Sequence, residues 1–342
     1  MIAVYFIIAL LCLRGFGLRK EADGDYLSHR QGDAVKGIFI LMVFLNHANY
    51  YIREAGHQYV NWYDTLFLDV SGKFGQLIVV MFLFLSGYGV MTAVKNRGAA
   101  YVRAMPRRRI LTVLLNFDVA VVLFAILQLA LGQVFPAKQY LLSLVGWEQI
   151  GNSNWYIFVI LLCYAATWLS ARLFGDGWKT LALTAGLLAV LYGVLAGCKE
   201  PDWYNTIVAY PMGMAACLGK ERLDGIGAKT YWAALAVSVL CLTLTYIRHQ
   251  DPLGLVHSFR TVAFTAVMVL LLMKVKVGNP ALDWLGKNLF FLYIYQRIPM
   301  ILLAYFDPCG ITASRPLLFV LVTFVLTLGL VPVMRKAYLC IK

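Results

Sequence analysis

Charged residues are scarce in this chain of 342 residues: Asp, Glu, Lys and Arg make up only 14% of it, while apolar residues make up 61%. With a mean hydropathy of +0.73, such usage is far from that of soluble domains. Long polar segments are missing too, since the longest stretches between apolar runs are 53–73, 95–109 and 133–153. These absences exclude a separate soluble domain and indicate a protein that crosses a membrane many times.

Cysteines in paired spacing are absent as well. The seven cysteines are dispersed and fall mostly within or at the ends of apolar runs, which argues against a disulfide framework and against a metal site. The formal net charge is +13, but the basic residues lie in short loops between apolar runs, where they report membrane orientation. We therefore expect no bound metal and no nucleic-acid partner.

Ten apolar runs are long enough to span a bilayer as helices. They lie near residues 35–52, 74–94, 110–132, 154–172, 180–197, 203–219, 230–247, 256–273, 288–306 and 316–334. The sixth run contains Pro211, so we expect a broken or tilted helix there. A shorter run, 1–13, lacks an Ala-x-Ala-like end, which favours an extra helix within 1–18 over a cleaved signal peptide. The pattern predicts an all-α bundle of ten transmembrane helices in one membrane-embedded domain, 30–342, preceded by that extra N-terminal helix.

The distribution of Lys and Arg predicts the orientation of this bundle. With 19–36 placed in the cytoplasm, 21 of the 30 Lys and Arg residues fall in cytoplasmic segments and 7 in outer ones. Because cytoplasmic loops carry the excess of positive charge, this threefold bias defines the topology. Both ends of the ten-helix core, including the C-terminus, are then cytoplasmic.

His47 is an ionisable side chain within the first run, and an ionisable group inside a membrane marks a candidate functional site. In a helix, the eleven residues from Lys36 to His47 make three turns and about 20°, which places both side chains on one face about 16 Å apart. Neutral imidazole is a suitable general base near neutral pH. The alternative is that His47 only forms a hydrogen bond to a neighbouring helix.

Several stretches share an order and spacing that point to a known family. They are Asp33-x-x-Lys36-Gly37 with His47, Ser86-Gly87-Tyr88-Gly89, the basic run ending Arg107-Arg108-Arg109, Asn152-Ser-Asn154-Trp155-Tyr156, and Leu285-Gly286-Lys287-Asn288. In this order they resemble the acyltransferase 3 family of integral membrane acyltransferases, over roughly residues 30 to 335. The resemblance implies a ten-helix bundle that transfers a short acyl group, usually acetyl, from cytoplasmic acyl-CoA to an acceptor, often a glycan, at the outer side.

On this basis we expect an acetyl-CoA-dependent O-acyltransferase of the bacterial cytoplasmic (inner) membrane that modifies an envelope or exported glycan. Two positions depart from the family pattern. Lys36 stands where the family usually has arginine, which keeps the charge but loses the bidentate fork that matches phosphate. Arg109 is followed by Thr112 where the family often has a second arginine.

The expected catalytic residues are His47, as the base, and Asp118, as the acid that orients its ring, with Glu54 as the alternative acid. When an acyl group moves from a thioester to an alcohol, the alcohol must lose its hydroxyl proton. A general base such as His47 can accept that proton. The residues expected to bind the phosphates of acetyl-CoA are Lys36, Arg107, Arg108 and Arg109. Topology alone is the alternative explanation for the charge of this loop.

Asn152, Asn154 and Trp155 begin the fourth run at its outer end, where we expect them to contact the glycan acceptor or to serve as ordinary interfacial residues. Arg297 lies deep in the ninth run and is expected to line a cavity and contact substrate, because a charge facing lipid is costly. The alternative function is a transporter or flippase that uses these ionisable residues as a proton-relay path. Against it, the sequence shows no clear internal repeat of broken helices, which many secondary transporters have.

Overall fold

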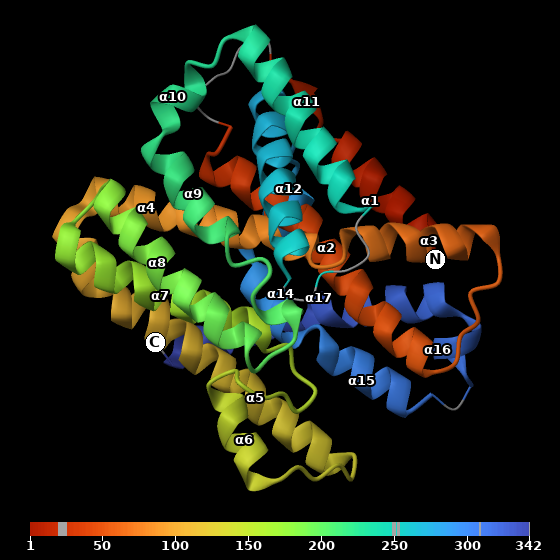
Figure 1. Ribbon diagram of the computed structural model, residues 1–342. Helices are drawn as coiled ribbons and strands as arrows, with labels where there is room; N and C mark the ends of the chain where they lie inside the picture. The colour runs from red at the N-terminus through yellow and green to blue at the C-terminus, as the bar shows by residue number, and fades with distance from the viewer. Residues whose placement is uncertain (20–25, 248–250, 252–253, 308, 342) are drawn as a thin grey trace.

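A computed structural model describes residues 1–19, 26–247, 251, 254–307 and 309–341. Helices dominate it (Figure 1), and the strands in this part of the chain are the short β1 (Gly17–Leu18) and β2 (Val275–Lys276), which pair antiparallel. A helix satisfies its own backbone hydrogen bonds, which a chain surrounded by lipid requires. The prediction of an all-α protein is confirmed.

The longer helices are α2 (His29–Glu54), α3 (Trp62–Phe74), α4 (Leu77–Met105), α5 (Thr112–Ala130), α7 (Trp155–Phe174), α8 (Trp178–Ala196), α11 (Ala228–Thr245), α12 (Leu255–Lys274) and α17 (Pro316–Ile341). The shorter ones are α1 (Ala3–Leu13), α6 (Ala137–Leu144), α9 (Ala209–Leu218), α10 (Lys220–Asp224), α13 (Pro280–Lys287), α14 (Leu289–Tyr295), α15 (Arg297–Tyr305) and α16 (Ile311–Ser314). A π-helical turn, η1 (Pro106–Leu111), joins α4 to α5, and a 3₁₀ turn, η2 (Pro201–Trp203), precedes α9.

Seven helical segments in the described chain are long and apolar enough to cross a membrane, one of them the continuous stretch from α3 through α5. The sixth predicted run is represented by α9, which has only 10 residues and contains Pro211. The ninth run is divided at Gln296 into α14 and α15. The shorter run 1–13 forms α1, whose 11 residues fall short of the about 20 that a span needs. The structure is therefore that of a multi-pass membrane protein, and the number of ten spans stays a prediction.

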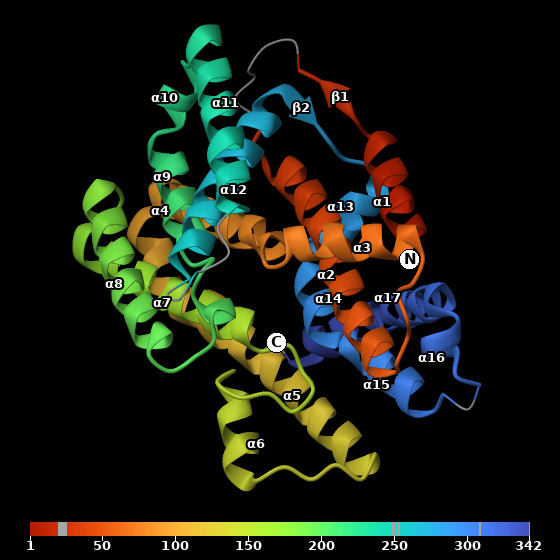
Figure 2. The same ribbon diagram turned by 45° about the vertical axis from the view of Figure 1, so that its right-hand side comes forward.

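The two ends of the bundle are occupied by different segments. In Figure 2 the β1–β2 pair lies at the top, beside α11 and α12, and the α5–α6 hairpin lies at the bottom. Between them, α2 and α4 form the centre: they hold long rows of buried apolar side chains and pack against each other. The site residues on these two helices are thus held by the best-packed part of the fold.

Two helix crossings bring backbones into direct contact at glycines. At the α4–α9 crossing, a Cβ atom on Gly213 would lie 2.0 Å from the carbonyl oxygen of Phe84, and one on Gly87 would lie 2.1 Å from that of Tyr210. At the α2–α13 crossing, a Cβ on Gly286 would lie 1.8 Å from the carbonyl oxygen of Asp33. Only glycine fits such distances, as at many close helix contacts in membranes. Because Gly87 is adjacent to Ser86 and Asp33 lies one helical turn before Lys36, these crossings fix the backbone that carries Ser86 and Lys36.

Candidate functional site

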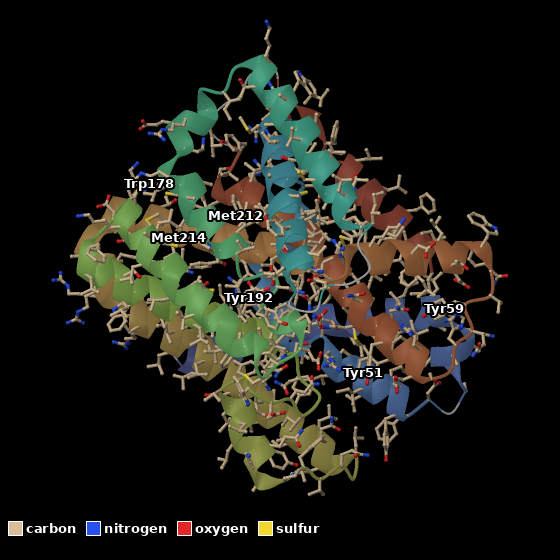
Figure 3. The ribbon with its side chains drawn as sticks, in the orientation of Figure 1. Tyr51, Tyr59, Trp178, Tyr192, Met212 and Met214 are labelled. Atoms are coloured by element: carbon tan, nitrogen blue, oxygen red, sulfur yellow. The ribbon has the colours of Figure 1, made fainter. Side chains whose placement is uncertain are left out.

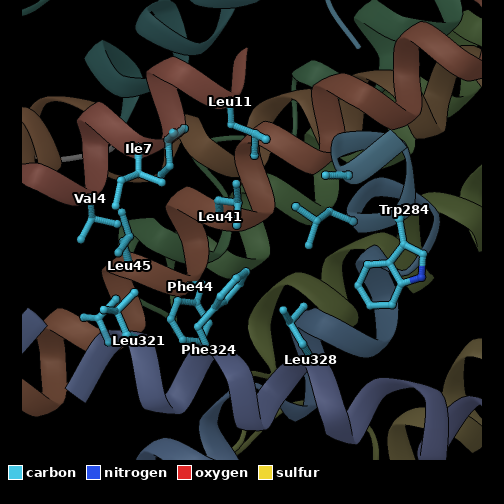
Figure 4. Close-up of a pocket in the computed structure, with 14 residues that line it drawn as sticks. Val4, Ile7, Leu11, Leu41, Phe44, Leu45, Trp284, Leu321, Phe324 and Leu328 are labelled. Atoms are coloured by element: carbon cyan, nitrogen blue, oxygen red, sulfur yellow. The ribbon is translucent and has the colours of Figure 1, made fainter. Parts of the chain in front are cut away.

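A groove of about 540 Å³ lies between α1, α2, α13 and α17 (Figure 4). Its lining comes from all four helices, with Val4, Leu41, Trp284 and Phe324 as examples. Every lining side chain is aliphatic or aromatic, so the groove offers no acid, base or nucleophile. The chemistry has to be sought in the more polar openings.

The Lys36 cavity, a second opening of about 390 Å³, lies between the start of α2, the middle of α4, η1 and α7. Its polar lining includes Ser28, His29, Lys36, Ser86, Arg109 and Tyr164. Gly89, which has open space around it, also lines the cavity, whereas Gly87 one half-turn earlier faces α9. The Ser86–Gly89 stretch therefore serves helix packing on one side and the cavity on the other.

Lys36 and Arg109 bring two positive charges to this cavity. The Lys36 ammonium donates to the Asp33 carboxylate at 3.2 Å, and its side chain is 26% exposed. Arg109 donates from Nε to the Tyr101 hydroxyl at 3.2 Å, which leaves the terminal nitrogens of the guanidinium for other partners. Two cations facing one cavity form a site suited to an anionic ligand such as phosphate.

The arginine run is divided by the π-helical turn. Within η1 the backbone N–H of Thr112 donates to the carbonyl of Arg107, five residues back. Arg107, Arg108 and Arg109 are all exposed, but of the three it is Arg109 that lines the Lys36 cavity. Of the four residues expected to bind phosphate, the structure brings together Lys36 and Arg109.

His47 lies on α2, three turns beyond Lys36, and is half-buried. Its ring centroid is 6.3 Å from that of Tyr293 on α14, and the charge of Arg297 is close enough to act on it. Within the described part of the chain no hydrogen bond reaches the imidazole of His47, and its Nδ1 is buried. The imidazole is therefore held by packing and keeps its nitrogens free for a ligand.

A row of aromatic side chains connects His47 to the Lys36 cavity. The ring of Tyr293 lies 5.3 Å from that of Tyr156, at the start of α7. The side chains of Tyr156 and Tyr164 both lie close to Ser86, which lines the cavity. A continuous path of side chains thus runs from the two cations to the histidine.

Arg297 begins α15 and lies on the other side of His47 from the cavity. Its Nε donates to the Tyr51 hydroxyl at 3.0 Å and its Nη1 donates to the carbonyl of Asn152 at 3.3 Å. The guanidinium also lies 5.8 Å and 5.5 Å from the ring centroids of Tyr50 and Tyr51; Tyr51 is labelled on α2 in Figure 3. Arg297 therefore ties α2 to the loop that precedes α7.

Asp118 lies in α5, with one carboxylate oxygen buried and without a hydrogen-bond partner. Among the described residues, no hydrogen bond or ion pair joins it to His47. The alternative acid, Glu54, is exposed at the last residue of α2. An acid that orients the ring of His47 is thus not evident in this geometry, and the role of Asp118 stays a hypothesis.

The two asparagines before α7 hold its preceding loop. The Asn152 side chain accepts from the backbone N–H of Ile150 at 2.9 Å, and that of Asn154 donates to the carbonyl of Gly146 at 3.0 Å. Asn154 and Trp155 also line a third opening of about 550 Å³, the Trp147 cleft, whereas Asn152 does not. Two of the three residues expected to contact the acceptor therefore share one cleft.

Sequence reasoning did not assign a role to Tyr51, Tyr156 or the cleft residue Lys199. Tyr51 follows His47 by four residues and so lies on the same helix face, which was a usable signal. The contacts of Tyr156 and Lys199 depend on how distant helices pack, and periodicity within one segment does not reveal them.

The fold and the site define a multi-pass membrane protein with an internal site for an anionic ligand. Its helices are compatible with lipid, and the site combines a half-buried histidine with a cavity that two cations line. The model of the acyltransferase 3 family, described as an acyltransferase domain, matches residues 32–335. The chain belongs to this family, so it is a membrane acyltransferase, and the resemblance drawn from the motifs is confirmed. Comparison with curated proteins and with solved structures gives no match.

Proposed function

We propose that this acyltransferase moves an acetyl or other short acyl group from acyl-CoA to a hydroxyl of an envelope or exported glycan. The observation that carries the proposal is the path from the Lys36 cavity through Ser86, Tyr156 and Tyr293 to His47. It joins a place for an anionic donor to a base that is free to react.

The donor side rests on charge and size. Lys36 and Arg109 are suited to the phosphates of coenzyme A, which are the anionic part of the donor. The cavity volume of about 390 Å³ lies within the range of small-ligand sites and suits the acyl-pantetheine arm, with the nucleotide nearer the opening. Along α2, the Lys36 to His47 distance of about 16 Å is one that an extended pantetheine arm can span.

The reaction needs one proton acceptor and one leaving group. His47 accepts the proton of the acceptor hydroxyl while the oxygen of that hydroxyl bonds to the thioester carbonyl carbon. The C–S bond then breaks, and the proton passes from His47 to the thiolate, which yields an ester and free coenzyme A. Arg297, whose charge acts on His47, lies where it favours negative charge on the carbonyl oxygen.

The orientation drawn from the loop charges completes the proposal. The Lys36 end of α2 faces the cytoplasm, where acyl-CoA is found, and the Arg297 side faces the outer surface, where a glycan is presented. The protein then belongs to the cytoplasmic membrane of a bacterium, with a cytoplasmic C-terminus.

The test uses the purified full-length chain in oriented proteoliposomes, with radiolabelled acetyl-CoA supplied on the Lys36 side. We expect free coenzyme A on that side and acetyl ester on glycan enclosed on the other. His47→Gln should lower this transfer by about 10² to 10⁴. The matched control is His257→Gln, which alters another half-buried histidine, on α12. Normal transfer by His47→Gln, or solute flux without consumption of acetyl-CoA, would overturn the proposal.

A further inference from the structure

The Trp147 cleft lies at the start of α7 and the end of α8, away from the Lys36 cavity. Trp155 lines it, and the ring of the next residue, Tyr156, lies 5.3 Å from that of Tyr293 beside His47. Tyr164, which lines the Lys36 cavity, is nine residues further along α7 than Trp155, a separation of about 13.5 Å along the helix axis. The cleft and the cavity therefore approach His47 from opposite directions.

Aromatic rings form one wall of the cleft. Trp147 and Trp203 lie 5.9 Å apart, and Phe158 packs against both of them at 5.4 Å and 5.7 Å. Both tryptophans are only partly buried, so part of each indole stays accessible from the cleft. A rigid, accessible indole face presents negative π density on which weakly positive C–H groups stack.

Lys199 is fully engaged by its neighbours. Its ammonium lies 4.2 Å from the ring centroid of Trp147 and 4.4 Å from that of Trp203. It also donates to the carbonyl of Trp147 at 2.8 Å and lies 3.7 Å from the carboxylate of Glu148. The only lysine of the cleft therefore organises the wall and is not free for an anionic ligand.

Two further carboxylates line the cleft without an ion-pair partner in the described part of the chain: Glu200 and Asp202. Burial, together with the charge of Glu200, raises the pKa of Asp202, although a hydrogen bond with Gln76 opposes the effect. An ionised carboxylate only accepts hydrogen bonds, so this pair calls for a ligand that donates them. It also repels a ligand that carries negative charge.

From these contacts we infer that the Trp147 cleft binds a neutral pyranose unit of the acceptor. The apolar face of the sugar ring packs on the indole of Trp155 and on the part of the Trp147 indole that Lys199 leaves uncovered, and its hydroxyls donate to Glu200 and Asp202. Uronic acids and other anionic sugars are rejected by the two unpaired carboxylates. The inference rests on the proposed transfer to a glycan and adds the class of sugar that is accepted.

Binding is tested on the full-length chain in nanodiscs without acyl-CoA, by saturation-transfer NMR. The probes are the methyl glycosides of glucose, galactose and mannose, and, as the anionic counterpart, methyl glucuronide. We expect at least one neutral glycoside to bind and the glucuronide to fail. The double variant Glu200→Gln/Asp202→Asn should weaken neutral binding about tenfold or more, since bonds to charged groups are lost, and should admit the glucuronide.

Matched controls separate the cleft from general effects. Glu221→Gln, on exposed α10, should leave binding unchanged, and so should Trp178→Ala at the far end of α8 (Figure 3). Trp147→Ala should weaken binding. Failure of all three neutral glycosides to bind, equal binding of the glucuronide, or an unaltered double variant would overturn the inference.

The two proposals fail in different ways. The protein could consume acetyl-CoA and acylate a glycan, while the double variant shows an unchanged KM for the acceptor. This result would contradict sugar binding at the Trp147 cleft and leave the proposed acyl transfer standing. The protein could instead bind neutral glycosides at the cleft but never release coenzyme A. This result would contradict the proposed acyl transfer and leave sugar binding at the cleft standing.

Discussion

Gly213→Ala tests the close crossing of α4 and α9. The added Cβ would lie 2.0 Å from the carbonyl oxygen of Phe84 and 2.8 Å from the backbone nitrogen of Tyr88. An ordinary contact begins at about 3.4 Å, so the two backbones would have to separate by about 1.4 Å, because neither atom belongs to a movable side chain. Overpacking of this kind costs about 1 to 3 kcal/mol.

The assay is thermal unfolding of the purified protein in one detergent at one scan rate, since membrane proteins often unfold irreversibly. The matched control is Gly186→Ala on α8, where a Cβ meets nothing within 4 Å. Both variants gain about the same helix propensity, up to about 1 kcal/mol. The difference in Tm between them therefore isolates the packing cost, and we expect Gly213→Ala to unfold several degrees lower. Equal Tm values would refute the reasoning that backbone contact holds this crossing.

Three further predictions concern single side chains. Arg109→Ala should raise the KM for acyl-CoA about tenfold at low salt while Arg107→Ala does not; equal effects of the two would contradict the division of the arginine run. Arg297→Lys keeps the charge but loses the fork that joins Tyr51 to the loop before α7, so kcat should fall about tenfold with little change in the KM for acyl-CoA; an unchanged kcat would speak against this role. Burial alone would raise the pKa of Asp307, but hydrogen bonds from residues of α16, including two backbone N–H groups at 2.7 Å, lower it. A lowered pKa adds stability that is fully present above the unfolded value of about 4 and is lost as the pH falls through the lower folded value, so Asp307→Asn should unfold at a lower temperature than the wild type at pH 7 and by a smaller margin near pH 3; an equal gap at both pH values would exclude the linkage.

Much of the helical fold could be predicted from the sequence, because lipid imposes length and apolarity on each span. The run 35–52 falls within α2, and all but the first residue of the run 154–172 falls within α7. The division of the ninth run at Gln296 was not predicted, although Pro299 in the first turn of α15 is a sequence signal for it, because proline has no N–H to donate to the carbonyl of Tyr295. There the Gln296 side chain donates to the carbonyl of Tyr293 at 3.3 Å, a local competition with the backbone that hydropathy does not reveal.

The site divides in the same way. The helical phase that puts Lys36 and His47 on one face is a property of one segment, so it could be predicted. The separation of Arg109 from Arg107 depends on a π-helical turn, in which each residue is displaced relative to an α-helix. Which helix Asp118 faces depends on packing between segments, and a single sequence carries little information about that.

The break at Gln296 makes Arg297 the first residue of α15. The backbone of Gln296 itself keeps α-helical φ and ψ, so the positive charge at this point comes from the guanidinium of Arg297. The guanidinium lies within reach of His47, and the Tyr51 hydroxyl and the Asn152 carbonyl hold it in place. Positive potential is therefore concentrated at one point before any substrate arrives, and negative charge that forms there needs no rearrangement of the protein to be stabilised.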